Sequence, residues 1–340
     1  MKKILVIGST VADIIINLDF LPTTADDVHV KSQTMSLGGC AHNVADMIRH
    51  FGAPYTLFSP VGTGLYGDFV RNQLAAKGLA SPMPTPDMAN GCCYCFVEES
   101  GERTFIVDHG AEYLFYREWF DQLKLDKLSC AYICGLEIEE KTGGVIVDFL
   151  EESGLPVFYG PGPRICLIDP ALMERIFALH PVMHLNEDEI CRYTGCDTIS
   201  AAAEALYDRT GNTIIITNGP NGAYYYGDYY YSDCFGGEES GYKGGGENNC
   251  EGGGENGREG SRKSGCEGGQ GLVHVPPVPV DHVVDTIGAG DAHCGAVMAG
   301  LSMGLSMYDA VAKANAASSL VVANKGGVLA DEVFDAAGIL

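Results

Sequence analysis

The chain has 340 residues, 46% of them hydrophobic, which is enough apolar material for the core of a globular α/β protein. With 45 Asp and Glu against 21 Lys and Arg, its formal net charge is −24, so neither nucleic acids nor anionic membranes are expected partners. No apolar run approaches the roughly 20 residues that a membrane span needs. The 13 cysteines lie mostly in apolar segments, as reduced thiols do, and a cytoplasmic location is expected.

Short apolar runs alternate along the chain with segments of helical periodicity. This alternation predicts a mainly parallel central sheet that is covered by helices on both faces. In chain order, the expected elements are strand 3–7, helix 41–50, strand 55–61, helix 67–77, strand 130–134, helix 143–152, strands 157–159 and 182–185, helix 201–209, strand 213–217, and helices 292–305 and 308–322.

Two segments have a different pattern. Residues 13–31, around a turn at Leu21 and Pro22, and residues 91–108, around a turn at 99–102, alternate apolar and polar side chains. Both predict antiparallel hairpins outside the main sheet.

Residues 232–271 are rich in Gly, Glu, Asn and Ser and nearly free of aliphatic side chains. Such a composition cannot form a core, so the segment is expected to be a flexible insertion. The rest of residues 1–340 is expected to form a single domain around it.

The sequence Asp-Thr-Ile-Gly-Ala-Gly-Asp at residues 285–291 leads into a helix of small apolar residues. The first N–H groups of a helix have no partner within it and lie at the positive end of its dipole, so the backbone of Gly288, Ala289 and Gly290 is suited to bind a phosphate. The carboxylate of Asp291 would face the same anion, where it would accept the proton of a substrate hydroxyl.

This sequence resembles the second signature of the ribokinase-like, PfkB-type carbohydrate kinases. The upstream sequence Gly-Gly-Cys-Ala-His-Asn-Val-Ala at residues 38–45, followed by Gly52 and Gly62, resembles the N-terminal signature of the same family. The resemblance implies a three-layer α/β/α fold of the ribokinase type with a small antiparallel β lid, which covers the substrate and often makes a homodimer contact.

The same resemblance implies the reaction. It is the ATP-dependent phosphorylation of a hydroxymethyl-type hydroxyl on a small sugar or nucleoside, with Asp291 as the base and the backbone of residues 288–290 as the anion hole.

Ligand-binding residues also follow from the resemblance. It assigns the substrate to Asp13, Gly39, Asn43 and Glu137, the nucleotide to Asn186, Thr217, Gly219, Gly222 and Asn315, Mg²⁺ to Glu189 through water, and a monovalent cation, typically potassium, to Asp285 and Ile287. For Asp13, the residue type itself supports the role that the resemblance assigns. A carboxylate just past a buried strand, as at Asp13, requires hydrogen-bond donors, and sugar hydroxyls supply them.

Three positions depart from the ribokinase pattern, where Asn, Lys and Phe are usual. They hold Val11, Cys40 and His293. Ribose is therefore disfavoured, and another sugar or a nucleoside remains open as the acceptor.

Two further alternatives belong to other functional classes. A protein that binds a sugar or nucleoside without catalysis would not need the intact glycines beside Asp291. The Gly-x-Gly-x-x-Gly at residues 62–67 is typical of dinucleotide sites. Such a site requires an acidic residue at the end of the next strand, roughly 20 positions later, but that region is the Pro-rich segment 81–86.

Overall fold

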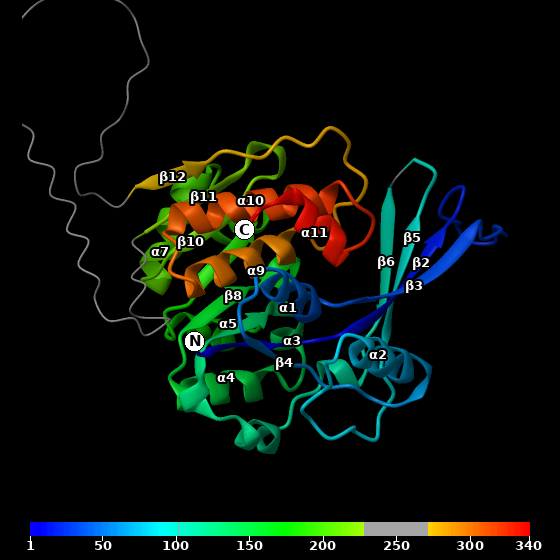
Figure 1. Cartoon of the computed structure of the whole chain (residues 1–340), viewed down its shortest axis with the longest axis horizontal. Helices are drawn as coiled ribbons and strands as arrows, with labels where there is room; N and C mark the ends of the chain where they lie inside the picture. The colour runs from blue at the N-terminus through cyan, green and yellow to red at the C-terminus, as the bar shows by residue number, and fades with distance from the viewer. Residues whose placement is uncertain (101, 228–270) are drawn as a thin grey trace, which may run out of the picture.

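The structure, a computed structural model, describes residues 1–100, 102–227 and 271–340. Its central sheet has eight strands in the order β12-β11-β10-β9-β8-β7-β1-β4 (Figure 1). The strands are β1 (Lys3–Ile7), β4 (Tyr55–Phe58), β7 (Leu128–Cys134), β8 (Val157–Gly160), β9 (Val182–Asn186), β10 (Ile214–Thr217), β11 (Ala223–Tyr226) and β12 (Leu272–Val275). All pairs from β4 to β10 are parallel, and β11 and β12 add an antiparallel edge, so the mainly parallel sheet is confirmed.

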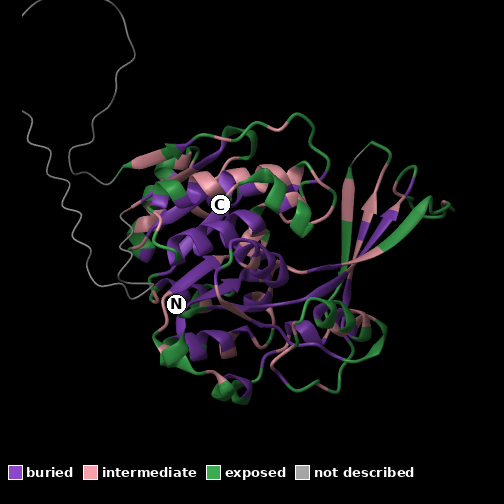
Figure 2. Cartoon of the chain, in the orientation of Figure 1, coloured by how far each residue is buried: buried purple, intermediate pink, exposed green. Residues whose placement is uncertain are grey.

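Helices cover both faces of this sheet, because alternate residues of its buried strands point to opposite sides. Ile4 and Val6 of β1 belong to one apolar core, and Leu5 and Ile7 belong to the other. The first core is covered by α1 (Cys40–His50), α2 (Gly64–Ala76), α9 (Ala289–Ser302), α10 (Met307–Val322) and α11 (Asp331–Ala337). The second is covered by α4 (Gly143–Ser153), α5 (Pro170–Phe177), α6 (Glu187–Thr194) and α7 (Ile199–Thr210). Figure 2 shows the sheet and the inner helix faces buried between the layers.

The lid is a separate four-stranded sheet in the order β3-β2-β5-β6. It is formed by β2 (Val11–Asn17), β3 (Ser32–Gly38), β5 (Cys92–Val97) and β6 (Arg103–Asp108). The two hairpins are antiparallel, but β2 and β5 run parallel, so this sheet is mixed and the prediction of a purely antiparallel lid is wrong. Each hairpin leaves the core in the same direction, and their inner strands therefore meet in parallel.

The expected bounds of the first hairpin are also wrong. The return strand was expected before residue 31, but Asn17 pairs with Ser32 and residues 18–31 form a loop between the strands. Pro22 has no N–H to donate to a ladder, and residues 22–27 are exposed, so the chain does not turn directly into a return strand there. The second hairpin lies within the expected residues 91–108.

Residues 232–270 of the predicted insertion lie outside the described residues. The strands on either side of it, β11 and β12, pair antiparallel, with Tyr226 opposite Leu272. The helices that the structure describes include none that is long and apolar enough to cross a membrane. The cytoplasmic location and the absence of nucleic-acid partners stay predictions.

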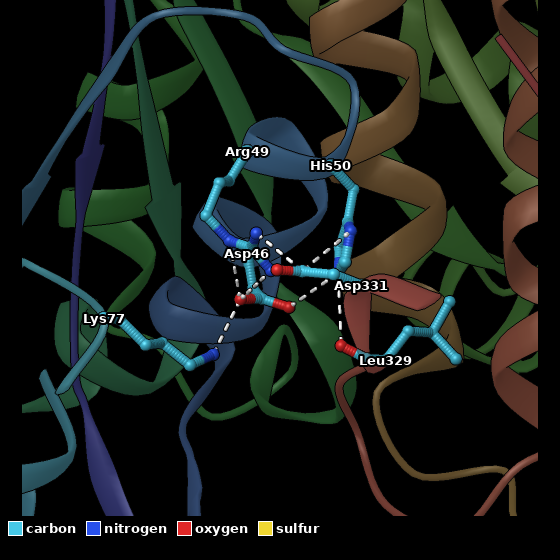
Figure 3. Close-up of polar contacts among 6 residues, drawn as sticks. All are labelled: Asp46, Arg49, His50, Lys77, Leu329 and Asp331. Atoms are coloured by element: carbon cyan, nitrogen blue, oxygen red, sulfur yellow. Dashed lines mark hydrogen bonds and ion pairs between the residues drawn. The ribbon is translucent and has the colours of Figure 1, made fainter. Parts of the chain in front are cut away.

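A buried charge cluster joins α1 to its neighbours (Figure 3). The carboxylate of Asp46 is 3% exposed and accepts hydrogen bonds from Lys77 at 2.8 Å and from Arg49 at 3.2 Å, and it pairs with His50 at 3.3 Å. Burial raises the pKa of Asp46, but the hydrogen bond from His50 and the charge of Lys77 outweigh burial and hold the pKa well below its usual range. Arg49 also pairs with Asp331 at 2.8 Å, so the cluster fixes α1 against α2 and α11.

We expect Asp46→Asn to lower the free energy of unfolding by about 3 kcal/mol at neutral pH, because its cationic partners lose a buried counter-charge. The folded-state pKa of Asp46 is depressed, so this stabilisation is present above the unfolded-state value of about 4 and is lost as the pH falls below it. Denaturant unfolding of both proteins as a function of pH measures this. Asp121→Asn, at an exposed ion pair with Arg117, is the matched control, and an equal loss in both variants would contradict the role of burial.

Candidate active site

Helix α9 begins at Ala289 because the residue before it turns the chain in a way that suits only glycine. Gly288 has φ of 72°, in the left-handed region, and a Cβ there would lie 2.6 Å from the Cα of Gly327. Helix α9 starts three residues earlier than the apolar pattern predicted and ends at Ser302, just before Gly304 with φ of 88°. Asp291 therefore lies in the first helical turn.

The backbone around this turn leaves donors free for an anion. Within the described residues, the N–H groups of Gly288 and Gly290 have no hydrogen-bond partner, and that of Ala289 has only a long contact of 3.4 Å with the carbonyl of Thr286. A Cβ on Gly290 would meet no atom within 4 Å. Gly288 and Gly290 both line a cavity of about 190 Å³. The geometry of a helix-terminal anion site is thus present.

Asp291 opens into the same cavity. Its Oδ2 accepts a hydrogen bond of 2.9 Å from the side-chain amide of Asn43 on α1, which is 248 residues away in the chain. Burial raises the pKa of Asp291 to about 7, against the lowering effect of the Asn43 hydrogen bond. A carboxylate with a pKa near neutrality is well matched to accept and release a proton.

Asp13 lies on β2, at the junction of the lid and the core. A Cβ on Gly38 would lie 2.0 Å from its Oδ2, so a larger residue there would displace the Asp13 carboxylate. Gly39 directly precedes α1 with φ of 96°, and a Cβ there would meet the carbonyl of Ser9 at 2.6 Å. Burial, and then the charge of Asp291, raise the pKa of Asp13 to about 7. The carboxylates of Asp13 and Asp291 are therefore close enough to interact electrostatically.

Two buried acceptors near this junction have no partner among the described residues, namely Oδ1 of Asn43 and Oε2 of Glu137. Glu137, on α3 (Gly135–Glu139), is 1% exposed, and its Oε1 accepts the N–H of Ser9 at 2.7 Å. Burial raises the pKa of Glu137. Buried acceptors without partners are rare in folded proteins, so these atoms are suited to hydroxyl donors of a ligand.

Asn186 and Glu189 lie across the cavity at the start of α6. The side chain of each caps the backbone of the other, with Oδ1 of Asn186 accepting the N–H of Glu189 at 2.8 Å and Oε2 of Glu189 accepting the N–H of Asn186 at 3.0 Å. This arrangement leaves Oε1 of Glu189 and the amide nitrogen of Asn186 for a ligand. Burial raises the pKa of Glu189.

A carboxylate oxygen on the cavity wall fits Mg²⁺ held through water and phosphate oxygens, as this hard cation prefers. No group of three or more His, Cys, Asp or Glu side chains in the described ranges could hold a metal by itself. Glu189 is therefore compatible with the water-mediated role expected of it.

The other residues that were predicted to bind the nucleotide do not all line the cavity. Thr217, at the end of β10 and in register with Asn186, lines the cavity. Gly219 and Gly222 belong to the turn after β10 and are not among the residues that line it. A Cβ on Gly222 would lie 2.4 Å from the carbonyl of Val275, so packing against β12 is sufficient to require glycine there.

Asn315, on α10, is engaged within the protein. Its amide nitrogen donates to the carbonyls of Val275 at 3.2 Å and Pro276 at 2.9 Å. Its oxygen then accepts from Nε2 of His293 at 3.2 Å. The cavity lining does not include Asn315, so its direct nucleotide contact stays a prediction without support from this geometry.

Asp285, expected to bind a monovalent cation with Ile287, instead forms an ion pair with Arg103 of the lid. Oδ1 of Asp285 also accepts the N–H of Ile287 at 2.8 Å, and Oδ2 accepts the N–H of Gly326 at 3.0 Å. The ion pair connects residues 182 positions apart, and no local sequence pattern indicates it.

The sequence did not single out several side chains of the cavity wall, among them a histidine and two cysteines. His184, Cys134 and Cys294 line it. His184 Nε2 shares a hydrogen bond of 2.8 Å with Nδ1 of His293, and burial lowers the pKa of both, that of His293 to about 4. The only signals were the position of Cys134 at the end of β7 and that of Cys294 shortly after Asp291.

Comparison with known proteins identifies the family. The model of the pfkB family of carbohydrate kinases matches residues 1–238 and 255–332. The chain belongs to this family. A relative from Escherichia coli (strain K12), described as the uncharacterized sugar kinase YegV, is 31% identical over 331 residues, which are 96% of this chain and 90% of YegV.

Solved structures show the same ribokinase fold. A putative ribokinase II of E. coli in complex with ATP and Mg²⁺ has a TM-score of 0.71 at 20% identity and covers 99% of both chains. The nucleoside kinase of Burkholderia thailandensis in complex with inosine has a TM-score of 0.69 at 18% identity and covers 98% of this chain and 95% of its own. The fold expected from the sequence is therefore confirmed.

We expect Asn43→Leu to raise the pKa of Asp291 by about one unit, because the ionised carboxylate loses its hydrogen-bond donor. Carboxyl ¹³C chemical shifts followed through a pH titration measure this pKa directly. Asn17→Leu is the control, because Asn17 lies in the lid and donates to the hydroxyl of Ser32. A pKa of Asp291 that is unchanged in Asn43→Leu would show that the bond does not hold in solution.

Proposed function

We propose that this protein phosphorylates a hydroxymethyl-type hydroxyl of a small sugar, using ATP. The observation that carries the proposal is that the Asp291 carboxylate and the free N–H groups of Gly288 and Gly290 open into one cavity. A base and an anion site in this relation can serve both ends of a phosphoryl transfer.

In the proposed reaction, Asp291 accepts the proton of the acceptor hydroxyl as its oxygen bonds to the γ-phosphorus. The bond between that phosphorus and the bridging oxygen breaks, and ADP leaves. The N–H groups of residues 288–290 donate hydrogen bonds to the phosphoryl oxygens and stabilise their charge in the transition state. Asn43 keeps Asp291 oriented through its amide.

The nucleotide would lie along the other wall, where Asn186 and Thr217 end two adjacent parallel strands. Mg²⁺, held through water by Glu189, would neutralise phosphate charge. The ATP and Mg²⁺ in the E. coli ribokinase II complex support this choice of cofactors. Gly219 and Gly222 would shape the turn beside the nucleotide.

The acceptor side favours a ligand with several hydroxyl groups. Asp13, Asn43 and Glu137 all offer acceptor oxygens, and two of these are buried without partners. A sugar supplies matching donors, since each hydroxyl carries one. Gly39 lets the backbone approach the ligand closely.

A nucleoside kinase is the second candidate, favoured by the inosine complex of the B. thailandensis neighbour. The catalytic turn would be the same, and only the group beyond the phosphorylated hydroxyl would differ. Measuring ADP release with a panel of pentoses, hexoses and nucleosides separates the two. A protein that binds these compounds and forms no phosphorylated product would be the non-catalytic alternative.

We expect Asp291→Asn to lower kcat by about 1,000-fold, because the amide cannot accept the hydroxyl proton. ATP affinity, measured by calorimetry, should stay close to that of the wild type, because the backbone donors remain. Asp126→Asn, at an exposed carboxylate, is the matched control and should retain full activity. Undiminished phosphorylation by Asp291→Asn would refute the role of Asp291 as the base.

We further propose that two copies of the chain associate through their lids. Strand β6 is an edge of the lid sheet, and it exposes Phe105, Ile106 and Val107 by 50%, 56% and 46% (Figure 2). An edge strand with apolar side chains is suited to pairing with a second sheet. The other lid would cover both the strand edge and these side chains.

We expect Ile106→Lys to convert this dimer into a monomer, because a charge would be buried in the interface. Light scattering after size-exclusion chromatography measures the mass. Leu167→Lys, at an apolar residue 59% exposed elsewhere on the surface, should leave the dimer intact. A wild-type protein that is monomeric at all concentrations would contradict the proposal.

A further inference from the structure

The ion pair between Arg103 and Asp285 joins the tip of the lid to the turn that forms the anion hole. Arg103 is the first residue of β6, at the end of the hairpin farthest from the core, and Asp285 lies in the loop before α9. Figure 1 shows the upper end of β6 beside that loop. The side chains are 18% and 4% exposed, so the pair is largely shielded from water.

Asp285 organises the backbone on both sides of the catalytic turn. Its Oδ1 fixes the N–H of Ile287, next to Gly288, and its Oδ2 fixes the N–H of Gly326. The adjacent Gly327 packs against Gly288, where a Cβ would lie 2.6 Å from its Cα. A displacement of the Asp285 carboxylate would therefore move the donors of the anion hole.

The donor set at Asp285 does not fit the monovalent cation that the family resemblance implies. Both carboxylate oxygens already accept N–H groups, and the positive charge beside them is the guanidinium of Arg103. A potassium ion at this carboxylate would face a like charge in a poorly solvated position, which is unfavourable. The protein thus provides its own cation.

We propose that Arg103 is a positioning residue that replaces a monovalent cation at Asp285 and couples the lid to the anion hole. Its charge compensates the buried carboxylate that orders residues 285–288 and 326. Because the guanidinium comes from the lid, the lid must be closed on the core for that carboxylate to be neutralised. The consequence for catalysis rests on the proposed kinase function.

The first test compares wild-type activity in potassium, sodium and choline salts at equal ionic strength. We expect equal rates, because the internal guanidinium makes an added cation unnecessary. A requirement for potassium in the wild type would overturn the proposal.

The second test substitutes the arginine. We expect Arg103→Met to lower kcat by about 100-fold, because the anion hole is no longer held in its productive geometry. Potassium or guanidinium ions, added at concentrations that leave the wild type folded and active, should restore part of this activity. Arg103→Lys should retain more activity than Arg103→Met, because it keeps the charge.

Arg117→Met is the matched control. Arg117 forms exposed ion pairs with Asp121 and Glu152, away from the cavity, so this variant should keep full activity and gain nothing from the added ions. Two outcomes would refute the charge-balancing role. In the first, Arg103→Met is folded and fully active. In the second, no added cation restores the activity of Arg103→Met, and Arg103→Lys loses as much activity as Arg103→Met.

A readout that does not depend on catalysis separates this inference from the proposed function. Hydrogen exchange of the Ile287 and Gly326 amides should be slow in the wild type and faster in Arg103→Met, even if no acceptor is ever phosphorylated. Unchanged exchange at both amides would overturn the inference alone. Should Arg103→Met fail to fold, exchange in Arg103→Lys and the salt comparison in the wild type still decide it.

Discussion

The site depends on one constraint, which is that a helix of the core begins with its N–H groups unpartnered and a carboxylate beside them. Gly288, in the left-handed region, makes this start. The free N–H groups are suited to an anion, and the Asp291 carboxylate opens into the same cavity. Burial raises the pKa of Asp291 to about 7, so near neutral pH an ionised fraction is present that can accept a proton.

The position of α9 depends in turn on small residues along its length. It packs against both α1 and α10, and a Cβ on Gly295 would lie 2.5 Å from the carbonyl of Val44 on α1. This close approach brings Asn43 to Asp291. The Asp46 cluster then fixes α1 from the other side, so a structural charge cluster supports the orientation of the Asp291 carboxylate.

Buried carboxylates around the site are stabilised in different ways. Asp46 is compensated by cations, Asp285 by the guanidinium of Arg103 and two N–H groups, and Glu189 by a reciprocal helix cap. Burial raises the pKa of both Glu137 and Asp13. Asp46 and Asp285 are therefore compensated by groups of the protein itself, whereas Glu137 keeps a buried oxygen without a partner among the described residues.

The sequence by itself determined the alternation of strands and helices, the two glycine signatures and the acid beside the anion site, because these are local patterns of three to eight residues. It misplaced the return strand of the first hairpin, since pairing depends on a partner rather than on alternation alone. Only the tertiary structure decided that β2 and β5 run parallel, that Asn315 is engaged by the backbone near β12, and that Arg103 reaches Asp285. Each of these depends on segments distant in the chain meeting in space, and no periodicity or motif encodes such a meeting.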